Sequence, residues 1–258
     1  MNDVNQSVTK ALKLLTLFSE KRPEISLQEI YEMTGMPKAT AYRLLASLEE
    51  GGFLRKIKKS EHDIRYRLGL KLLELGNLVS EDLELRQAAF DHMKALCKEI
   101  NEVVHLSVCE GEEAIYIEKV ESNQAIRLYT RVGKRMPLFA GSGPKLLLAF
   151  LPKTRQKEII SRMKFEEFTP YTITNEKKLY QELETIRQQG FAESLGEQDP
   201  DTVGFSFPIR DFSGEVVGAL GVTGPSMRFS DGRRSEILEK TQKAAQAISE
   251  DLGFRGFL

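Results

Sequence analysis

The sequence predicts an α+β fold in two parts, a short helical module with a β-hairpin followed by a larger domain built around an antiparallel sheet. Two observations support this prediction. Residues 26–48 show two runs of helical periodicity, interrupted by a glycine and a proline. From residue 103 onward the apolar residues instead form short strand-like runs, in two groups of three with helical segments between the groups.

The segment 26–48 has the features of two short helices joined by a tight turn. Ser26 and Glu29 have the S-x-x-E spacing of a capping box, in which each side chain bonds a backbone N–H near the other residue. Gly35 suits the end of the first helix, because glycine adopts the left-handed cap without strain. Pro37 suits the first turn of the second helix, where no backbone N–H is needed. The segment is therefore predicted to be a helix-turn-helix, an element that enters the major groove of DNA.

The second of these helices has an apolar face and a polar face. The apolar stripe follows the i, i+3, i+4, i+7 spacing of a buried surface and comprises Ala41, Leu44, Leu45 and Leu48. On the opposite face, Arg43 is suited to bind a guanine through two hydrogen bonds, and Tyr42 to reach a base or a phosphate. The first turn is suited to phosphate, because a helix N-terminus attracts anions. The expected DNA contacts of this helix are Lys38, Ala39, Thr40, Tyr42 and Arg43.

Flanking segments complete a winged helix-turn-helix. Upstream, an amphipathic helix is predicted from the apolar stripe Val8, Ala11, Leu12, Leu15 and Phe18. Downstream, residues 53–57 and 64–68 are predicted to be strands around a polar loop. The cationic wing side chains expected to contact DNA are Lys56, Lys58, Lys59 and Arg65. The alternative interpretation is a three-helix packing module with a solvated basic face, and the charge of the wing favours DNA binding.

The charge of the chain is unevenly distributed along its 258 residues, which suffice for one large or two ordinary domains. The net charge is −1, yet residues 36–71 hold nine Lys/Arg and four Asp/Glu, whereas residues 77–258 hold 24 Lys/Arg and 28 Asp/Glu. A basic module joined to an acidic domain is typical of a DNA reader joined to a sensor. We expect a DNA-binding domain over residues 1–69, a linker helix over 70–86 and a second domain over 87–258.

The second domain is predicted from the alternation of strands and helices. The expected strands lie at about 103–111, 114–121 and 125–133, and then at 191–195, 204–209 and 216–223. The expected helices lie at about 85–100, 145–151, 153–163, 176–189 and 231–252. Strands in two groups, with helices inserted between them, favour helices packed on a single antiparallel sheet.

Neither a metal site nor a catalytic set is predicted. The two cysteines form no CxxC motif, and the three histidines lack the spacing of metal ligands. The glycine-rich segment 141–145 lacks the spacing of a phosphate-binding loop, so no nucleotide and no other cofactor is expected. Because no signal peptide and no apolar run of membrane-spanning length is found, we expect a cytoplasmic, nucleoid-associated protein without a membrane partner.

Four parts of the chain form a recognisable series: the winged module, GEEAIYIEKV at 111–120, RVGKRMPLFAGSGPKLLLAFLP at 131–152 and FPIRDFSGEVVGALGVTGPSMRF at 207–229. In their order and spacing they resemble the IclR family of bacterial transcriptional regulators. The resemblance extends from about Ser7 to about Leu252. It implies a winged helix-turn-helix joined by a linker helix to a GAF/PAS-like effector-binding domain. It also implies dimers or dimers of dimers on palindromic operator DNA, regulated by small organic, sugar or aromatic acids.

The same resemblance implies an effector pocket between the glycine-rich turn and the last strands of the sheet. The residues that it assigns to the pocket are Ser142, Gly143, Ser194, Gly204, Gly221 and Thr223. Gly204 and Gly221 stand where family members often carry a small polar side chain. We therefore expect this pocket to lose hydroxyl or thiol contacts and to gain room, which would suit an effector larger than a two- or three-carbon acid.

The sequence thus predicts a ligand-responsive DNA-binding regulator that senses a small carboxylate, either a sugar acid, a keto acid or an aromatic acid. Repression is expected by analogy with the family. A metabolic enzyme with an accessory winged helix is the alternative, but no convergent catalytic residues are found and we expect no enzyme activity. A protein-interaction module that uses the winged helix as a docking surface is a further alternative.

Overall fold

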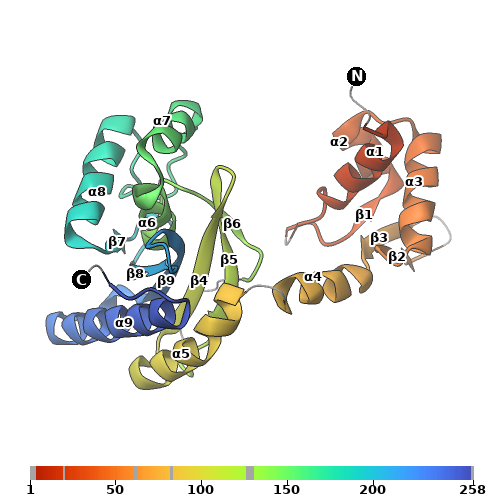
Figure 1. Cartoon of the computed structure of the whole chain (residues 1–258). Coiled ribbons are helices and arrows are strands. Elements are labelled where there is room, and N and C mark those ends of the chain that lie inside the picture. The colour runs from red at the N-terminus through yellow and green to blue at the C-terminus, as the bar shows by residue number, and fades with distance from the viewer. Residues whose placement is uncertain (1–3, 20, 61–62, 82–83, 126–130, 257–258) are drawn as a thin grey trace. The chain divides into compact units, whose positions relative to one another are not determined.

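The computed structural model describes residues 4–19, 21–60, 63–81, 84–125 and 131–256. Contacts within the chain divide it into two compact units, residues 1–82 and 83–258, which are described separately (Figure 1). The division falls within the segment predicted as the linker. That segment contains helix α4 (Lys71–Glu81) and the beginning of helix α5 (Glu84–Ile100).

The N-terminal unit is a winged helix-turn-helix, as predicted. Its three helices are α1 (Gln6–Leu15), α2 (Leu27–Thr34) and α3 (Lys38–Glu50). The strands β1 (Ile25–Ser26), β2 (Leu54–Lys58) and β3 (Ile64–Leu68) form an antiparallel sheet in the order β1-β3-β2. The core between helices and sheet consists of Leu14, Ile25, Ile30, Ala41, Leu45, Leu48, Leu54 and Tyr66.

Local hydrogen bonds explain where α2 begins and ends. The Ser26 hydroxyl accepts a hydrogen bond of 3.2 Å from the Glu29 N–H, and the Glu29 carboxylate accepts one of 2.7 Å from the Ser26 N–H. The predicted capping box is therefore present. Gly35 ends the helix with a φ of 65°, in the left-handed region that glycine adopts without strain. Pro37 directly precedes the first residue of α3.

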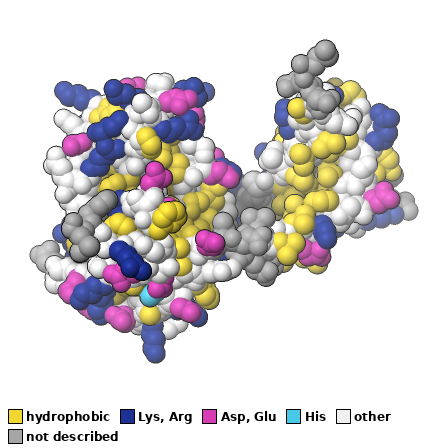
Figure 2. Space-filling model, in the orientation of Figure 1, with side chains coloured by type: hydrophobic (Ala, Val, Ile, Leu, Met, Phe, Trp, Pro, Cys, Tyr) yellow, Lys and Arg dark blue, Asp and Glu magenta, His cyan; other side chains and the backbone are white. Residues whose placement is uncertain are grey.

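The buried face of α1 differs from the predicted stripe. Leu14 is the buried residue of this helix, while Val8 and Leu12 are 54% and 57% exposed. The physical reason is that two apolar stripes overlap on α1 and share Ala11 and Leu15, and only the stripe that includes Leu14 faces the core. Figure 2 shows apolar side chains gathered on the face of this unit that carries α1.

The C-terminal unit contains a six-stranded antiparallel sheet in the order β6-β5-β4-β9-β8-β7. The strands are β4 (Val103–Glu110), β5 (Glu113–Val120), β6 (Arg135–Pro137), β7 (Ala192–Leu195), β8 (Thr202–Arg210) and β9 (Val216–Pro225). Five of the expected strands are confirmed. The expected strand at 125–133 is not: residues 131–133 are not in a strand, β6 follows them, and residues 126–130 lie outside the described part of the chain.

One face of this sheet is apolar and packs against α5 and α9 (Asp231–Asp251). Alternate residues of the three central strands point to this face, among them Val104 and Leu106 of β4, Phe205 of β8, and Leu220 and Val222 of β9. These side chains are buried with the apolar faces of the two helices, which lie beside each other below the sheet in Figure 1. The period-two alternation of the strands thus supplies half of the domain core.

The opposite face is covered by α6 (Ser142–Phe150), with α7 (Lys153–Arg162) and α8 (Glu176–Gln189) packed beyond it. Strand residues of the other parity point to this face, and below the start of α6 they are polar or glycine. They are His105, Ser107, Gly204, Ser206, Gly221 and Thr223. Helix α6 begins at Ser142, three residues before the predicted start, so that Ser142 and Gly143 form its first turn above this polar strip.

The cap of α2 generates a prediction about stability. Replacing Ser26 by alanine removes the hydroxyl that accepts from the Glu29 N–H, and we expect the stability of the N-terminal unit to fall by about 1 kcal/mol. Amide hydrogen exchange of α2 in the full chain measures this loss. Ser47→Ala is the matched control, because the Ser47 hydroxyl only bonds the Arg43 carbonyl within α3. Equal protection of α2 in both variants would contradict the role assigned to the cap.

Candidate functional site

The outward face of α3 presents most of the side chains expected to contact DNA. Lys38, Ala39, Tyr42 and Arg43 are exposed, while Thr40 is half-buried. Ala41, Leu45 and Leu48 are buried on the opposite side and fix the helix in the unit. The ammonium group of Lys38 lies 5.8 Å from the ring centroid of Tyr31, an exposed residue of α2. An exposed helix with an arginine, a tyrosine and small residues is suited to reading base edges in the major groove.

The wing presents fewer free charges than its sequence suggests. Lys56 and Lys58 are exposed on β2, with no ion pair in the part of the chain that the structure describes. Lys59 instead forms an ion pair of 2.5 Å with Glu24. Arg65 contacts the carboxylates of Glu29 and Asp63 at 3.3 and 3.2 Å.

These ion pairs bear on the predicted DNA contacts. Because Arg65 binds the same carboxylate that caps α2, it links β3 of the wing to the helix-turn-helix. Its expected role in DNA binding thus competes with a structural role that sequence alone did not indicate.

A small cavity lies in the C-terminal unit, at the N-terminal end of α6 and above the polar strip of the sheet. Its volume is about 30 Å³. It is lined by His105, Tyr116, Gly141, Ser142, Gly143, Pro144, Ser194, Gln198, Asp199, Thr202, Gly204 and Thr223. Five of the six residues predicted for the effector pocket are in this set, so strands distant in the sequence meet the turn as expected.

Gly221, the sixth predicted residue, does not line the cavity. It pairs with His105 across β4 and β9, and a Cβ atom added at residue 221 would lie 2.0 Å from the imidazole ring. A Cβ atom at Gly204 would lie 3.0 Å from the Ser142 hydroxyl oxygen. The room expected from these glycines is therefore occupied, at residue 221 by the ring of His105 and at residue 204 by converging hydroxyl groups.

His105 is a pocket residue that the sequence reasoning did not select. It is 2% exposed, its Nε2 atom lies 2.7 Å from the Thr223 hydroxyl, and its ring packs edge-on against Tyr116 at 4.8 Å between centroids. Its Nδ1 atom is buried and has no hydrogen-bond partner within the described residues. Burial lowers the pKa of His105 to about 4, so the ring is neutral near pH 7. In the sequence, a histidine between Val104 and Leu106 gave no sign of facing a cavity.

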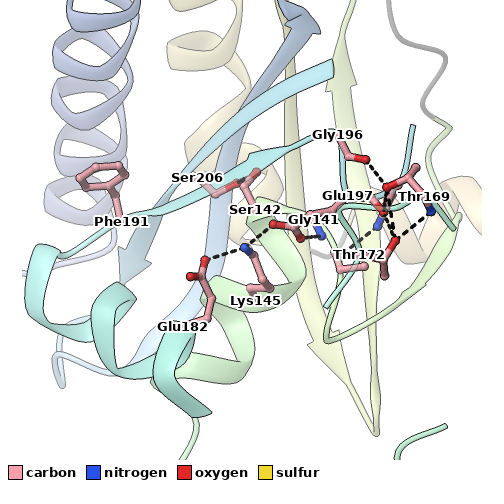
Figure 3. A network of polar contacts seen from close by, with 12 residues as sticks. Gly141, Ser142, Lys145, Thr169, Thr172, Glu182, Phe191, Gly196, Glu197 and Ser206 are labelled. Carbon is pink, nitrogen blue, oxygen red and sulfur yellow. Dashed lines mark hydrogen bonds and ion pairs between the residues drawn. The ribbon is translucent and has the colours of Figure 1, made fainter. Parts of the chain in front are cut away.

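A buried ion pair holds the turn that forms the wall of the cavity (Figure 3). The ammonium group of Lys145 is 1% exposed and lies 2.5 Å from a Glu197 oxygen and 2.6 Å from a Glu182 oxygen. The second Glu197 oxygen accepts a hydrogen bond of 2.8 Å from the Gly141 N–H. Burial raises the pKa of Glu197, an effect that the ammonium group of Lys145 opposes. The segment around Glu197 thereby fixes both the turn and the first helical residues of α6.

The first turn of α6 is suited to bind an anion. Gly141 at the N-cap position has no side chain to cap the helix. Ser142 and Gly143 are the first two residues of α6, so their N–H groups have no partner within the helix. The Ser142 hydroxyl accepts a hydrogen bond of 2.9 Å from Ser206. Backbone donors and hydroxyls therefore converge at the cavity, which is the chemistry that recognises a carboxylate.

The remaining chemical expectations concern metals, cysteines and membranes. Among the described residues, no cluster of three His, Cys, Asp or Glu side chains could hold a metal ion. Cys97 and Cys109 are unpaired thiols, and His92 pairs with Asp251 at 2.8 Å. His62 lies outside the described residues. In the helices that were described, none has the length and apolar character required to span a membrane.

The burial of His105 generates a prediction about pH. The unfolded chain binds a proton at this residue below about pH 6.5, whereas the folded chain does so only near pH 4, so the stability should fall as the pH is lowered through this window. His105→Phe removes this contribution, which is on the order of 3 kcal/mol when complete. Chemical denaturation of both proteins between pH 7 and 4 measures it, and the difference between them isolates residue 105 from Glu197. Parallel pH profiles would contradict the prediction.

Comparison with known proteins agrees with both units. The family model for the IclR helix-turn-helix domain matches residues 7–57, and that for the C-terminal part of bacterial transcriptional regulator IclR matches residues 78–250. The HTH-type transcriptional regulator KipR of Bacillus subtilis is 37% identical, covering 98% of this chain and 100% of its own length.

Solved structures agree as well. The IclR structure of Thermotoga maritima aligns with a TM-score of 0.76 and 32% identity, over 96% of this chain and 99% of that one. An IclR homologue from Microbacterium hydrocarbonoxydans, solved in complex with 4-hydroxybenzoate, aligns with a TM-score of 0.81 and 26% identity, also over 96% and 99%. The chain therefore belongs to the IclR family of bacterial transcriptional regulators.

Proposed function

We propose that this DNA-binding transcriptional regulator responds to a small carboxylate bound in the cavity at the start of α6. The cavity itself is the observation that carries the proposal, because it brings five predicted effector residues to uncapped backbone N–H groups. The solved homologue in complex with 4-hydroxybenzoate, a carboxylic acid, supports the acidic character of the effector. The proposed effector contacts are Ser142, Gly143, Ser194, Gly204 and Thr223, whereas Gly221 acts by seating His105.

On the DNA side, we propose that α3 reads base edges and that the wing binds phosphates. Arg43 and Tyr42 are the proposed base contacts, with Lys38, Ala39 and Thr40 at the approach of the helix to the backbone. Lys56 and Lys58 are the proposed wing contacts, because they are exposed and have no ion pair among the described residues. Lys59 and Arg65 remain secondary candidates, since each would have to leave a carboxylate to reach a phosphate.

The proposed assembly is a dimer, or a dimer of dimers, on a palindromic operator. Two helices of the N-terminal unit expose large apolar side chains, Val8 and Leu12 on α1 and Leu73 and Leu78 on α4. Apolar surface of this kind is costly in water and marks a site of association. A two-fold assembly would place two α3 helices on two half-sites of the same sequence.

The proposed mode of action is repression at the nucleoid, with the effector shifting the protein between two arrangements of its DNA-binding units. Such a shift requires that the effector bind one arrangement more tightly than the other. Repression is here an analogy with the family. An enzymatic role is not proposed, because relatives such as KipR are named as transcriptional regulators.

The role of α3 generates a prediction about base specificity. Arg43→Ala should weaken binding to the operator by about 1–3 kcal/mol and relax the preference at one base pair, because a bidentate contact to a base is lost. The operator would first be selected from a random duplex library, and fluorescence anisotropy would then measure binding to all single-base variants at fixed salt.

Two further variants make this test specific. Lys58→Ala should weaken binding evenly across sequences and reduce the salt dependence by about one counterion, because it contacts a phosphate. Lys157→Ala removes the same charge from α7 of the C-terminal unit and should leave binding unchanged. An unaltered base preference in Arg43→Ala would refute the assignment of this residue.

The cavity generates a prediction about effector binding. An acid that binds only the folded protein should raise its stability by about 2.7 kcal/mol at 100 times the Kd, which a thermal-shift screen detects as a higher Tm. Thr223→Val should reduce this shift, because it removes a hydroxyl group of the cavity at constant shape. Thr185→Val, on the exposed surface of α8, is the matched control. Equal shifts in both variants would place the effector elsewhere.

A further inference from the structure

The cations of the wing differ in their surroundings according to the face of the sheet on which they lie. Residues directly opposite each other in an antiparallel pair point to the same face. By the register of β2 and β3, Lys56 and Lys58 lie on the face of the buried Tyr66. Arg67 lies on the other face, and Glu24, which directly precedes β1, falls opposite it in the register of β1 and β3. On this second face, a carboxylate is thus placed beside a cation.

Glu24 binds two cations of the wing. One oxygen of its carboxylate lies 2.5 Å from the Lys59 ammonium nitrogen, and the other contacts the guanidinium group of Arg67. The hydrogen bond from Lys59 lowers the pKa of the Glu24 carboxyl, so the group is ionised near pH 7. The side chain of Glu24 is 11% exposed, whereas those of Lys59 and Arg67 are 50% and 41% exposed. Both cations are therefore within reach of a phosphate, while the carboxylate that holds them is largely covered.

Lys59 lies where a DNA phosphate is expected to approach. It follows Lys58, a proposed phosphate contact, at the end of β2, and its N–H donates to the Asp63 carbonyl group at 2.9 Å across the turn of the hairpin. A carboxylate and a phosphate offer a lysine or an arginine the same partners, a negative charge and acceptor oxygens. Glu24 therefore occupies donors of Lys59 and Arg67 that a phosphate would use, and its charge repels a phosphate that approaches them.

A purely structural role accounts for these ion pairs less well. Pairs that involve side chains as exposed as those of Lys59 and Arg67 add little to the stability of a protein. For DNA binding the same pairs matter more, because the affinity depends on how many cations neutralise phosphates and release counterions. With a single carboxylate, the wing withdraws two cations from that number.

We propose that Glu24 competes with DNA phosphates for Lys59 and Arg67, and thereby sets the affinity of the wing for DNA below the value that its cations could supply. This inference rests on the proposed function, in which the wing binds phosphates. It adds Arg67 to the phosphate contacts of the wing and makes both contacts conditional on release from Glu24. A lower affinity for DNA leaves the bound state within the range that the differential binding of a small effector can reverse.

The test removes the charge of Glu24 in the full chain and keeps its shape. In Glu24→Gln an amide oxygen still accepts a hydrogen bond, but no negative charge holds the two cations. Fluorescence anisotropy measures binding to a labelled duplex of mixed sequence, about 30 base pairs long, at several salt concentrations, because such non-specific binding depends on phosphates. We expect binding about tenfold tighter near 0.1 M salt, and a salt dependence steeper by about one counterion.

Glu50→Gln is the matched control. It removes the same charge from the same unit, at the exposed C-terminal end of α3, and Glu50 forms no ion pair with any residue that the structure describes. We expect it to change the affinity by less than about twofold, because salt screens a charge that lies far from the phosphates. Circular dichroism and thermal unfolding establish that each variant is folded.

Variants of the cations in both backgrounds identify the side chains that Glu24 holds. Lys59→Ala and Arg67→Ala should leave binding nearly unchanged in the wild-type background, and each should lower the affinity severalfold in the Glu24→Gln background. Lys58→Ala should weaken binding equally in both, because no carboxylate among the described residues pairs with Lys58. If Glu24→Gln does not fold, the wild-type background decides alone. The salt dependence should then fall by about one counterion in Lys58→Ala and stay the same in Lys59→Ala.

The outcomes separate the inference from the proposed function. Equal affinities of Glu24→Gln and Glu50→Gln, weaker binding by Glu24→Gln, or an equal cost of Lys59→Ala in both backgrounds would overturn the competition by Glu24. The proposed role of the wing stands in each of these cases as long as Lys58→Ala weakens binding. If Lys58→Ala has no effect, or if the wild-type protein binds no duplex even at the lowest salt, the proposed phosphate contacts fail, and the inference fails with them.

Discussion

A single buried ammonium group holds together the parts of the C-terminal unit that form the cavity. Lys145 is on α6, Glu182 on α8 and Glu197 in the segment after β7, and the two carboxylates meet at an ammonium group that is 1% exposed. A charge buried in this way requires close partners, because an unpaired one costs several kcal/mol. The pairing therefore sets the position of α6 along the sheet. Glu197 also accepts a hydrogen bond from the Gly141 N–H. The segment that carries Glu197 is held in turn by the hydroxyls of Thr169 and Thr172, which donate to the carbonyl groups of residues 196 and 197 (Figure 3).

The two faces of the sheet differ in role: one contributes to the apolar core, and the other contributes residues to the cavity. Residues of one parity along β4, β8 and β9 are apolar and pack against α5 and α9. Residues of the other parity are polar or glycine below α6, and His105, Gly204 and Thr223 among them line the cavity. A polar strip of this kind weakens the core on that side, and the large apolar cluster around α6, α7 and α8 offsets the loss. Along each of these strands, residues that pack in the apolar core thus alternate with residues on the polar face below α6.

Much of this organisation could be predicted from sequence, because local signals agreed with the final structure. Capping residues, the αL glycine at residue 35 and the apolar stripes identified α2 and α3, and the order of strands and helices identified the α+β class. The start of α6 could not be placed, because Gly143 and Pro144 are poor helix formers in isolation and only burial against the sheet makes Ser142 helical. The choice between two overlapping stripes on α1 likewise depended on the tertiary packing of Leu14.

Features that depend on pairs of distant residues were beyond sequence reasoning. Nothing local to Arg65 or Lys59 shows that they meet Glu29 and Glu24. The net positive charge of the winged module therefore overstated the charge available to DNA. For the cavity, glycine at residue 221 suggested empty space. The sequence does not show which neighbour fills the place of a missing side chain, and here it is the ring of His105.

The contact between Gly221 and His105 has a consequence for evolution within the family. An imidazole ring placed as that of His105 is and a side chain at residue 221 cannot both keep these positions, because a Cβ atom at 221 would lie 2.0 Å from Cε1 of the ring. Substitution at one site is therefore tolerated only after the other has changed, and the intermediate with both side chains present is disfavoured. A lineage that acquires a serine at residue 221 must also move or replace the ring of His105, which lines the cavity. Residues 105 and 221, which pair across neighbouring strands of the sheet, are therefore expected to change together.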